Sequence, residues 1–184
     1  MTIDQFTGQA ITVWPVDASL PKRDCSLFQK VLLSTDGTVT ELLSLYCGRP
    51  IRARKIAQSL ATGAAPVALA AAPHERVLHR TIVLGSGVGD ELLFADSCFV
   101  FDRFSAAIQR DLMQSELPIG LLWRRERLEM HREIVDRRSE TCAAVANLLG
   151  AANDAILYCR TYVIFHQHRP LGVITEKFCA TALR

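Results

Sequence analysis

The chain has 184 residues, of which 49% are hydrophobic and 22% are charged. This mixture is typical of a globular protein, and the length favours one domain that buries enough surface to fold without a disulfide or metal staple. A formal net charge of +2 argues against a dedicated nucleic-acid binder. High hydrophobicity and the lack of long like-charge blocks argue against a long disordered tail.

The first residues, the longest uncharged stretch and the cysteines predict a cytoplasmic protein with no membrane partner. Residues 1–15 lack the basic start and apolar run of a secretory signal. The longest uncharged stretch, residues 56–74, contains two prolines and many alanines, so we expect no membrane-spanning helix. Six cysteines without CxxC spacing are expected to be reduced, small apolar residues. They are Cys25, Cys47, Cys98, Cys142, Cys159 and Cys179.

Two helices are predicted near the start of the chain. Residues 27–33 carry apolar side chains at helical spacing. After a turn at residues 34–37, a second helix is predicted to start at Thr38. Thr38 and Glu41 fit a capping box, in which the hydroxyl and the carboxylate each accept a hydrogen bond from a backbone amide.

A strand is predicted at residues 51–56, and an alanine- and proline-rich stretch follows at residues 61–73. The small side chains and prolines of this stretch supply little hydrophobic core. We interpret it as a mobile surface loop or, alternatively, as a lid over a pocket.

The rest of the chain alternates between strands and helices joined by short turns. The predicted strands form two hairpins, residues 76–84 with 91–101 and residues 156–165 with 171–178. Helices are predicted at residues 103–113 and 142–149, whereas residues 119–135 suit either a strand or a helix. This order indicates an α+β fold with a mostly antiparallel sheet.

Three charged residues break the alternation of the predicted strands. Arg80 shares its face with Ile82, and Glu176 shares its face with Ile174, so both charges are predicted to point inward. A buried unpaired charge is costly, so we expect Arg80 and Glu176 to meet each other, a buried network or a ligand. The third residue, Asp96, favours a structural role as partner of an arginine or of backbone amides.

Other polar clusters carry weaker signals. His166 and His168 are interpreted as turn histidines rather than metal ligands, because no third ligand stands at metal spacing. Residues 124–140 hold six arginines and five acidic residues, which is typical of a solvated, ion-paired face. The glycine-rich turn at residues 85–89 lacks the pattern of a phosphate loop.

Four stretches in sequence resemble the chorismate pyruvate-lyase family, in particular a divergent branch formerly described as a domain of unknown function. The likeness covers most of the chain from about residue 25 onward and preserves order and spacing. The stretches are LLSTDGTVTELLSLYCGRPI (32–51), ERVLHRTIVL (75–84), LFADSCFVFDRFSAAIQRDLMQSELPIG (93–120) and RTYVIFHQHRPLGVITEKF (160–178).

The resemblance implies a fold and an activity. Enzymes of this family split chorismate into 4-hydroxybenzoate and pyruvate without metal or organic cofactor, on a mostly antiparallel six-stranded sheet with helical excursions. It implies a single domain over residues 25–184 after an N-terminal segment at 1–24, with a strand at residues 119–135 and a flap over the ligand at 61–73. We expect chorismate as the small-molecule partner and a monomer or weak homodimer.

The resemblance also implies the site residues. The family's substrate-site arginine falls on Arg80 and its essential glutamate on Glu176, the two charges that alternation marks as inward. Backbone ligand contacts fall on Val39, with an uncertainty of one residue toward Thr38, and on Ile119. A capped helix start at Thr38 suits a carboxylate of dianionic chorismate.

Two other functions compete with this expectation. A relative of this fold serves as a small-molecule sensing domain in transcription regulators, so the chain is alternatively a non-catalytic module that binds an aromatic or dicarboxylate metabolite. A structural protein, in which Arg80 and Glu176 only pair with each other, is the third hypothesis. Release of pyruvate from chorismate distinguishes the lyase from both.

Overall fold

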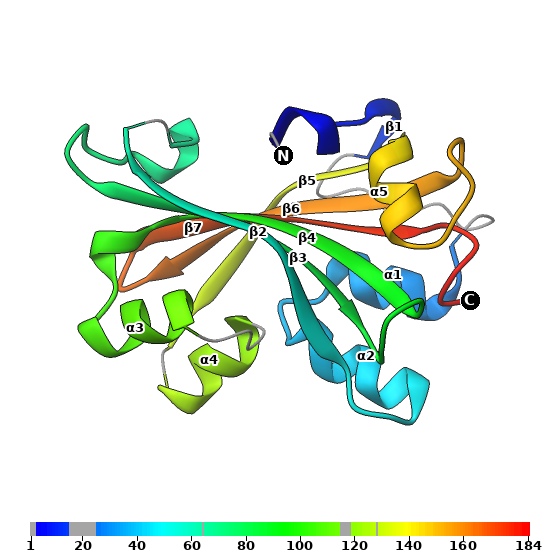
Figure 1. The fold of residues 1–184 in the computed structure, drawn as a ribbon, viewed down its shortest axis with the longest axis horizontal. Helices are drawn as coiled ribbons and strands as arrows, with labels where there is room; N and C mark the ends of the chain where they lie inside the picture. Colours follow the sequence, from blue (N-terminus) through cyan, green and yellow to red (C-terminus); the bar gives the residue numbers. More distant parts are fainter. Residues whose placement is uncertain (1–2, 15–24, 64, 115–118, 128) are drawn as a thin grey trace.

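One antiparallel sheet runs through the middle of the molecule (Figure 1). The computed structural model describes residues 3–14, 25–63, 65–114, 119–127 and 129–184. Within them the sheet has seven strands in the order β1-β5-β6-β7-β4-β3-β2. The strands are β1 (Gln9–Trp14), β2 (Arg52–Thr62), β3 (Arg76–Gly85), β4 (Glu91–Val100), β5 (His131–Thr141), β6 (Ile156–His166) and β7 (Arg169–Cys179).

The predicted α+β fold with a mostly antiparallel sheet is confirmed. Six strands lie between residues 52 and 179, as the resemblance implies, and both predicted hairpins form as β3–β4 and β6–β7. A seventh strand, β1, comes from the N-terminal segment at residues 1–24 and pairs antiparallel with β5.

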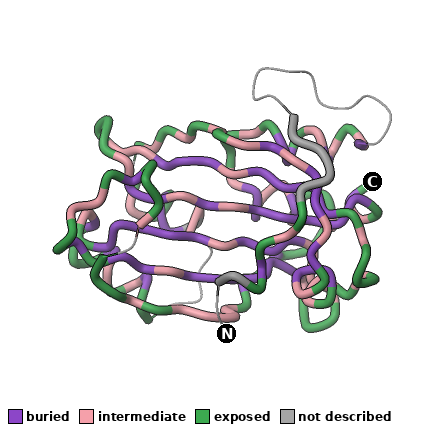
Figure 2. Tube along the Cα trace, turned by 90° about the horizontal axis from the view of Figure 1, so that it is seen from above, coloured by how far each residue is buried: buried purple, intermediate pink, exposed green. Residues whose placement is uncertain are grey.

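Four helices cover the lower face of the sheet in Figure 1. They are α1 (Leu27–Ser34), α2 (Val39–Cys47), α3 (Ala106–Gln114) and α4 (Ile119–Arg125). The largest cluster of buried apolar side chains lies between them and the sheet and includes Leu43, Ile82, Trp123 and Ile174. The middle strands are mostly buried along their length, whereas the loops at the ends of the sheet are exposed (Figure 2).

Short elements cover the upper face. A 3₁₀ turn η1 (Ile3–Phe6) and helix α5 (Ala143–Leu148) cover one cluster, and a second 3₁₀ turn, η2 (Val67–Leu69), covers another. A third 3₁₀ turn, η3 (Phe101–Arg103), leads from β4 toward α3. Because both faces are covered, the middle strands are apolar on both sides.

The two predicted helix starts have different caps. At α1, Ser26 and Gln29 form a complete capping box that the sequence analysis did not identify. At α2, Thr38 is the N-cap residue as predicted, but it makes no side-chain cap hydrogen bond. The predicted Thr38–Glu41 box is therefore wrong, because Glu41 instead forms an ion pair with Arg124 of α4.

The family-based assignment of residues 119–135 as a strand throughout is wrong. Residues Ile119–Arg125 form α4, and β5 begins only at His131. A helix was the open alternative for this segment, and the structure has one in its first part, whereas Ile134 lies in the strand. Leu122 and Trp123 of α4 are buried against the sheet, which a strand in that place would not achieve.

The alanine-rich stretch at residues 61–73 packs on the upper face. Leu69 of η2 is fully buried with Val77, Cys98 and Val100. The Arg103 guanidinium donates hydrogen bonds to the carbonyl oxygens of Leu69 and Ala70. These contacts hold the stretch on the side of the sheet opposite the cavity described below, so it is not a lid over that cavity.

Gly172 in β7 is required by a close approach. A Cβ atom at this position would lie 2.2 Å from the Phe99 ring on the neighbouring strand. Phe99 is fully buried against Phe104 and Trp123, so the ring has little freedom to move away.

The structure also bears on the membrane-span and disulfide expectations. Among the described residues, no helix is both long and apolar enough to span a membrane. All six cysteines are free, and all of them except Cys47 are buried.

Candidate active site

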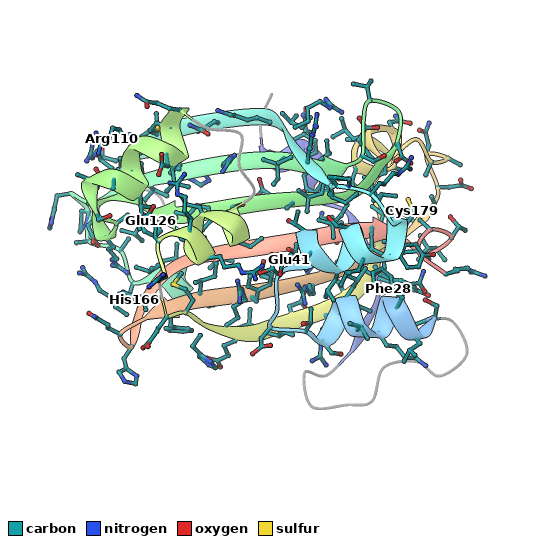
Figure 3. All side chains as sticks on the ribbon, turned by 90° about the horizontal axis from the view of Figure 1, so that it is seen from below. Phe28, Glu41, Arg110, Glu126, His166 and Cys179 are labelled. Carbon is teal, nitrogen blue, oxygen red and sulfur yellow. The ribbon has the colours of Figure 1, made fainter. Side chains whose placement is uncertain are left out.

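A small cavity lies on the lower face of the sheet, between the starts of α2 and α4. Its volume is about 40 Å³. Figure 3 views this face from below, with Glu41 on α2 at the side facing α4. The lining residues come from both helix starts and from strands β3 to β7: Gly37, Thr38, Val39, Thr40, Ile82, Leu84, Ala95, Ser97, Ile119, Gly120, Trp123, Arg132, Tyr162, Ile164, Ile174 and Glu176.

Glu176 is the one carboxylate in this lining. Its side chain is buried, and each carboxylate oxygen accepts a hydrogen bond from β6. Arg160 Nε donates to Oε2 at 2.7 Å, and the Tyr162 hydroxyl donates to Oε1 at 3.1 Å. Burial, with the neighbouring Glu176 charge, raises the pKa of Tyr162. Tyr162 therefore stays protonated and acts as a hydrogen-bond donor to the Glu176 carboxylate.

Strand register explains why Arg160 reaches Glu176. The two residues are direct partners across the β6–β7 pair, and both point to the lower face. The Arg160 side chain is 2% exposed, and its guanidinium lies 5.1 Å from the centre of the Tyr162 ring. Arg160 Nη1 also donates to the Thr35 carbonyl oxygen at 2.6 Å. Its Nη2 is buried and has no hydrogen-bond partner among the described residues.

Two further arginines on β5 bind carbonyl groups at the end of α1 and in the connection to α2. Arg132 donates to the Asp36 carbonyl oxygen, and Arg137 donates to the Leu33 carbonyl oxygen at 3.1 Å. Burial and, secondarily, the charge of Arg160 lower the pKa of Arg137. These cations stand at the carboxyl end of α1, where the helix dipole favours positive charge.

Arg80 lies at the other side of the cavity on β3. It is 2% exposed, as the alternation predicts, and its Cα pairs in register with Ser97, which lines the cavity. Arg80 is not itself among the lining residues. The ion pair that the structure shows for Glu176 is with Arg160, a residue that the sequence analysis did not single out.

The start of α2 forms one wall. The first backbone amides of a helix have no partner within the helix, and at α2 the N-cap residue Thr38 makes no side-chain hydrogen bond to them. Val39 is buried, and the Thr38 methyl group lies close to Gly120, where an added Cβ would approach it to 3.0 Å. A positive helix end with uncapped amides suits an anionic group.

The structure thus brings the predicted residues Thr38, Val39, Ile119 and Glu176 to one cavity, with Arg80 adjacent to its lining. Pro118, which directly precedes Ile119, lies outside the described residues. Three polar residues of the site were missed: Arg132, Tyr162 and Arg160. For Arg160 the signal was available, because it shares strand parity with Tyr158 and Ile164 and is as inward as Arg80.

Asp96 and Lys177 belong to the upper face and not to the cavity. The Thr81 hydroxyl donates to Asp96 at 2.8 Å, so the partner is neither an arginine nor a backbone amide as predicted. Burial raises the pKa of Asp96. Lys177 is also buried and donates to Glu140 and to the Phe6 carbonyl oxygen, each at 2.5 Å.

The arginine-rich stretch at residues 124–140 is only partly the solvated face that was predicted. Arg124 and Arg125 do form exposed ion pairs, with Glu41 and Asp111. Arg137 and Glu140, in contrast, are buried on opposite faces of β5. Pairing of β5 with β6 in the interior of the sheet places these charges inside.

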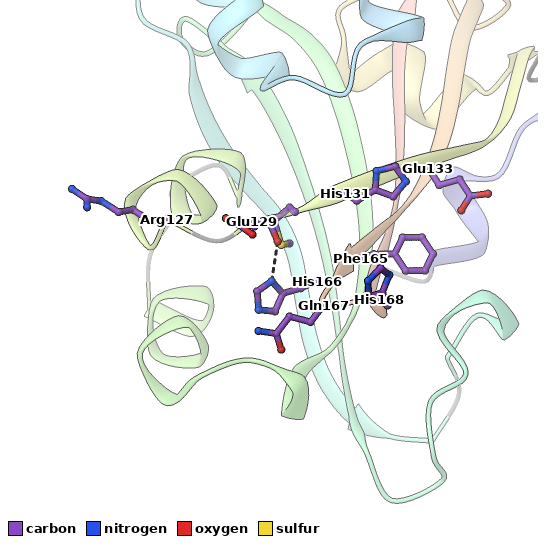
Figure 4. A pocket seen from close by; sticks show the side chains of 9 residues that line it. Arg127, Glu129, His131, Glu133, Phe165, His166, Gln167 and His168 are labelled. Atoms are coloured by element: carbon purple, nitrogen blue, oxygen red, sulfur yellow. Dashed lines mark hydrogen bonds between the residues drawn. The ribbon is translucent and has the colours of Figure 1, made fainter.

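A larger hollow of about 980 Å³ lies at the tip of the β6–β7 hairpin (Figure 4). All nine of its lining residues are exposed or partly exposed, including His131, His166 and His168. The His166 ring hydrogen bonds to the Glu129 carbonyl oxygen at 2.8 Å, and His168 lies in the turn with φ 63°. Among the described residues, no three His, Cys, Asp or Glu side chains are grouped to hold a metal ion. Because it buries no charge, this open hollow is a weaker candidate than the small cavity.

Comparison with known proteins identifies the family. A sequence profile of the family described as "Chorismate pyruvate-lyase Rv2949c-like" matches residues 33–184. The chain belongs to this family. One similar curated protein is MJ0807 of Methanocaldococcus jannaschii, whose name describes it as a proposed lyase. It is 28% identical over an alignment of 155 residues that covers 82% of this chain and 77% of MJ0807.

Solved structures of similar fold come from transcription regulators. The effector domain of PhnF from Mycobacterium smegmatis aligns with a TM-score of 0.60 and 19% identity, covering 78% of this chain and 88% of that domain. The C-terminal domain of the histidine utilization repressor from Pseudomonas syringae aligns with a TM-score of 0.55 and 14% identity, covering 73% and 94%. At these identities the likeness concerns the fold alone.

Proposed function

We propose that this protein is a lyase that converts chorismate to 4-hydroxybenzoate, or a closely related hydroxybenzoate, and pyruvate. The observation that carries the proposal is a buried glutamate, Glu176, held between two donors in the wall of a cavity that also contains an uncapped helix start. Membership of the lyase family supports it.

The charges around the cavity suit a dianionic substrate. Arg80, Arg132, Arg137 and Arg160 lie on the same face of the sheet as the single lining carboxylate, Glu176. In our proposal Arg80 makes a charge-assisted contact to one carboxylate, and the amides near Val39 bind the other. Apolar residues such as Ile82 and Ile174 face the ring.

The chemistry needs a base and a fixed substrate conformation. One ring C–H bond and the bond from the ring to the ether oxygen break, and the released enolpyruvate takes up a proton at its CH₂ group to become pyruvate. Formation of the aromatic ring drives the reaction, so the protein has only to hold the reactive conformer and manage the proton. Glu176, as an ionised carboxylate, is proposed to accept the ring proton.

Ligand entry requires the cavity walls to separate. An apolar cavity of about 150 Å³ accepts a benzene ring, whereas this cavity measures about 40 Å³. The start of α4 faces the start of α2 through Gly120 and Thr38, and the Arg124–Glu41 ion pair that joins the two helices is exposed. Movement of α4 away from α2 is therefore the least costly way to admit a substrate.

The test is a coupled lactate dehydrogenase assay for pyruvate from purified protein and chorismate, with chromatographic identification of the aromatic product. Glu176→Gln keeps the shape of the side chain and removes the charge, and we expect it to lower kcat by about 100-fold or more. Arg80→Gln is expected to raise KM. Glu129→Gln, a glutamate of the open hollow, is the matched control and should leave both constants unchanged.

A different result favours the alternative function. The similarity of the fold to effector domains makes a binding module the second candidate. If the protein releases no pyruvate, but chorismate raises its melting temperature and Arg80→Gln abolishes that rise, the site binds without catalysis. No release and no thermal response would contradict the lyase function and show that chorismate is not the ligand of this site.

A further inference from the structure

Arg160 contacts two parts of the site that lie far apart in the sequence. Its Nε atom donates a hydrogen bond to the Glu176 carboxylate near the end of the chain. Its Nη1 atom donates to the carbonyl oxygen of Thr35, before the start of α2. We propose that Arg160 is the positioning residue that fixes the Glu176 carboxylate and the α2 start in one arrangement. This inference rests on the proposed function, because it assigns a role toward the same site.

The first of these hydrogen bonds restricts the carboxylate to one orientation. Arg160 Nε binds Oε2 at 2.7 Å, and the Tyr162 hydroxyl binds Oε1 at 3.1 Å. The Tyr162 ring lies beside the guanidinium and is itself buried, so neither donor rotates freely. A base held by two donors from one rigid strand keeps its oxygens directed at a fixed point in the cavity.

The second of these hydrogen bonds fixes the helix start. Thr35, which accepts the hydrogen bond from Arg160 Nη1 at 2.6 Å, is the C-cap residue of α1. Arg132 holds the next carbonyl group, that of Asp36, and Val39 begins α2 three residues later. With successive carbonyl groups held by strand residues, the short connection leaves the first amides of α2 little freedom.

The Glu176 carboxylate lies among several cations. Arg137 is the register partner of Arg160 on β5 and adds a second buried cation on its other side. Around Glu176, the described charged or titratable groups on this side of the sheet include Arg80 on β3, Arg132 and Arg137 on β5, and Tyr158, Arg160 and Tyr162 on β6, with Glu41 on α2 and Arg124 on α4 at the rim. Removal of Arg160 takes away the cation in direct contact with Glu176, so ionisation of the carboxylate becomes harder.

The experiment compares Arg160→Gln, Arg160→Lys and Tyr162→Phe with Arg103→Gln. Arg103 is a matched control, because it is a buried arginine on the other face that holds a glutamate and loop carbonyl groups. For pyruvate release, we expect Arg160→Gln to lower kcat by about 100-fold and to move the acidic limb of the pH profile to higher pH. Lysine has one nitrogen and cannot hold both partners, so Arg160→Lys should restore only part of the rate.

Arg103→Gln should keep the kcat and pH profile of the wild type in its folded fraction. Tyr162→Phe, which preserves the packing, should lower kcat by about tenfold, since it removes one donor from Glu176. The proposal is overturned if Arg160→Lys and Tyr162→Phe fold and retain the wild-type kcat and pH profile, or if Arg103→Gln changes both as Arg160→Gln does.

A second readout separates this inference from failure of the proposed function. If the wild type releases no pyruvate, calorimetric binding of chorismate and 4-hydroxybenzoate is measured for the same variants. Binding weakened about tenfold or more by Arg160→Gln, but not by Arg103→Gln, supports the positioning role in a site that only binds. Unchanged binding in Arg160→Gln, or no binding to the wild type, overturns it.

Discussion

Two buried arginines, Arg160 and Arg103, are built on the same plan on opposite faces of the sheet. Each contacts one glutamate and also donates to backbone carbonyl groups of a connection between elements. The side chains of Arg103 and Glu75 are 4% and 9% exposed, and those of Arg160 and Glu176 are 2% and 8% exposed. Burial and ion pairing therefore do not distinguish the two assemblies.

The difference lies in how fully the donors are used and in what the glutamate faces. Arg103 binds Glu75 through two nitrogens, and all of its nitrogens donate, to Glu75 or to the carbonyl groups of Leu69, Ala70 and Pro170. Arg160 binds Glu176 through one nitrogen and leaves Nη2 without a partner among the described residues. Only Glu176 lines the small cavity. A fully satisfied pair is typical of structure, whereas a pair beside a cavity with an unused donor is typical of a site.

The largest expected effect is on stability, from Arg103→Gln. Removing one partner of a buried ion pair typically costs about 3–5 kcal/mol, because the other charge stays buried. Urea unfolding monitored by circular dichroism measures this loss in the free energy of unfolding. If the variant also changed KM for chorismate in its folded fraction, the conclusion that the Arg103 pair is structural and only the Arg160 pair belongs to the site would be wrong.

Acid unfolding tests the same assembly from the side of Glu75. The hydrogen bond from Arg103 lowers the pKa of Glu75 from 4.5 to about 2. A carboxyl group with a lowered pKa in the folded state contributes stability that is present above pH 4.5 and is lost as the pH falls toward 2. We expect Glu75→Gln to flatten the pH dependence of the melting temperature over this window. If the melting temperature of the variant depended on pH as steeply as that of the wild type, the lowered pKa of Glu75 would be contradicted.

A smaller effect is expected for Asp96, a carboxylate with a hydroxyl partner and no arginine. Burial raises its pKa, so its contribution to stability is present at low pH and is lost as the pH rises through the folded-state pKa. Asp96→Asn keeps the acceptor for Thr81 and removes the charge. We expect the melting temperature at pH 7 to rise, with a gain in the free energy of unfolding of about 1 kcal/mol. A loss of stability would show that the attraction of a nearby cation to the Asp96 carboxylate outweighs the cost of burying its charge.

The smallest effect is expected for the exposed pair Arg124–Glu41, whose side chains are 63% and 45% exposed. Exposed ion pairs contribute about 0–1 kcal/mol, so Arg124→Gln should leave the free energy of unfolding nearly unchanged. Because this pair joins α2 to α4 beside the cavity, stopped-flow binding of 4-hydroxybenzoate should show an equal or faster association rate. A slower rate at unchanged stability would show that the pair guides ligand entry.

Much of the fold could be predicted from local pattern. Helices near residues 27–33 and 142–149 and both hairpins follow from periodicities of 3.6 and 2 and from turn residues, which are properties of neighbouring positions. The inward direction of Arg80 and Glu176 follows from the same period of two. The error at residues 119–125 came from extending the strand assignment over a whole segment whose pattern suits either a strand or a helix.

The partners of the charged residues could not be predicted in the same way. Glu41 was assigned to a capping box, but α4 supplies Arg124 as a competing partner. Asp96 was assigned an arginine or amide partner, but the register of β3 and β4 places Thr81 opposite it. In each case a residue distant in sequence displaced the local interpretation.

The sequence by itself determined the family, the α+β class and the inward direction of two charges, because these depend on motifs and on the alternation of side chains along a strand. Only the tertiary structure decided that Glu176 contacts Arg160, that three arginines bind carbonyl groups at the end of α1 and in the connection to α2, and that the alanine-rich stretch lies on the face opposite the cavity. The physical reason is that strand register and the choice of covered face are set by packing between segments far apart in the chain, which no local pattern encodes.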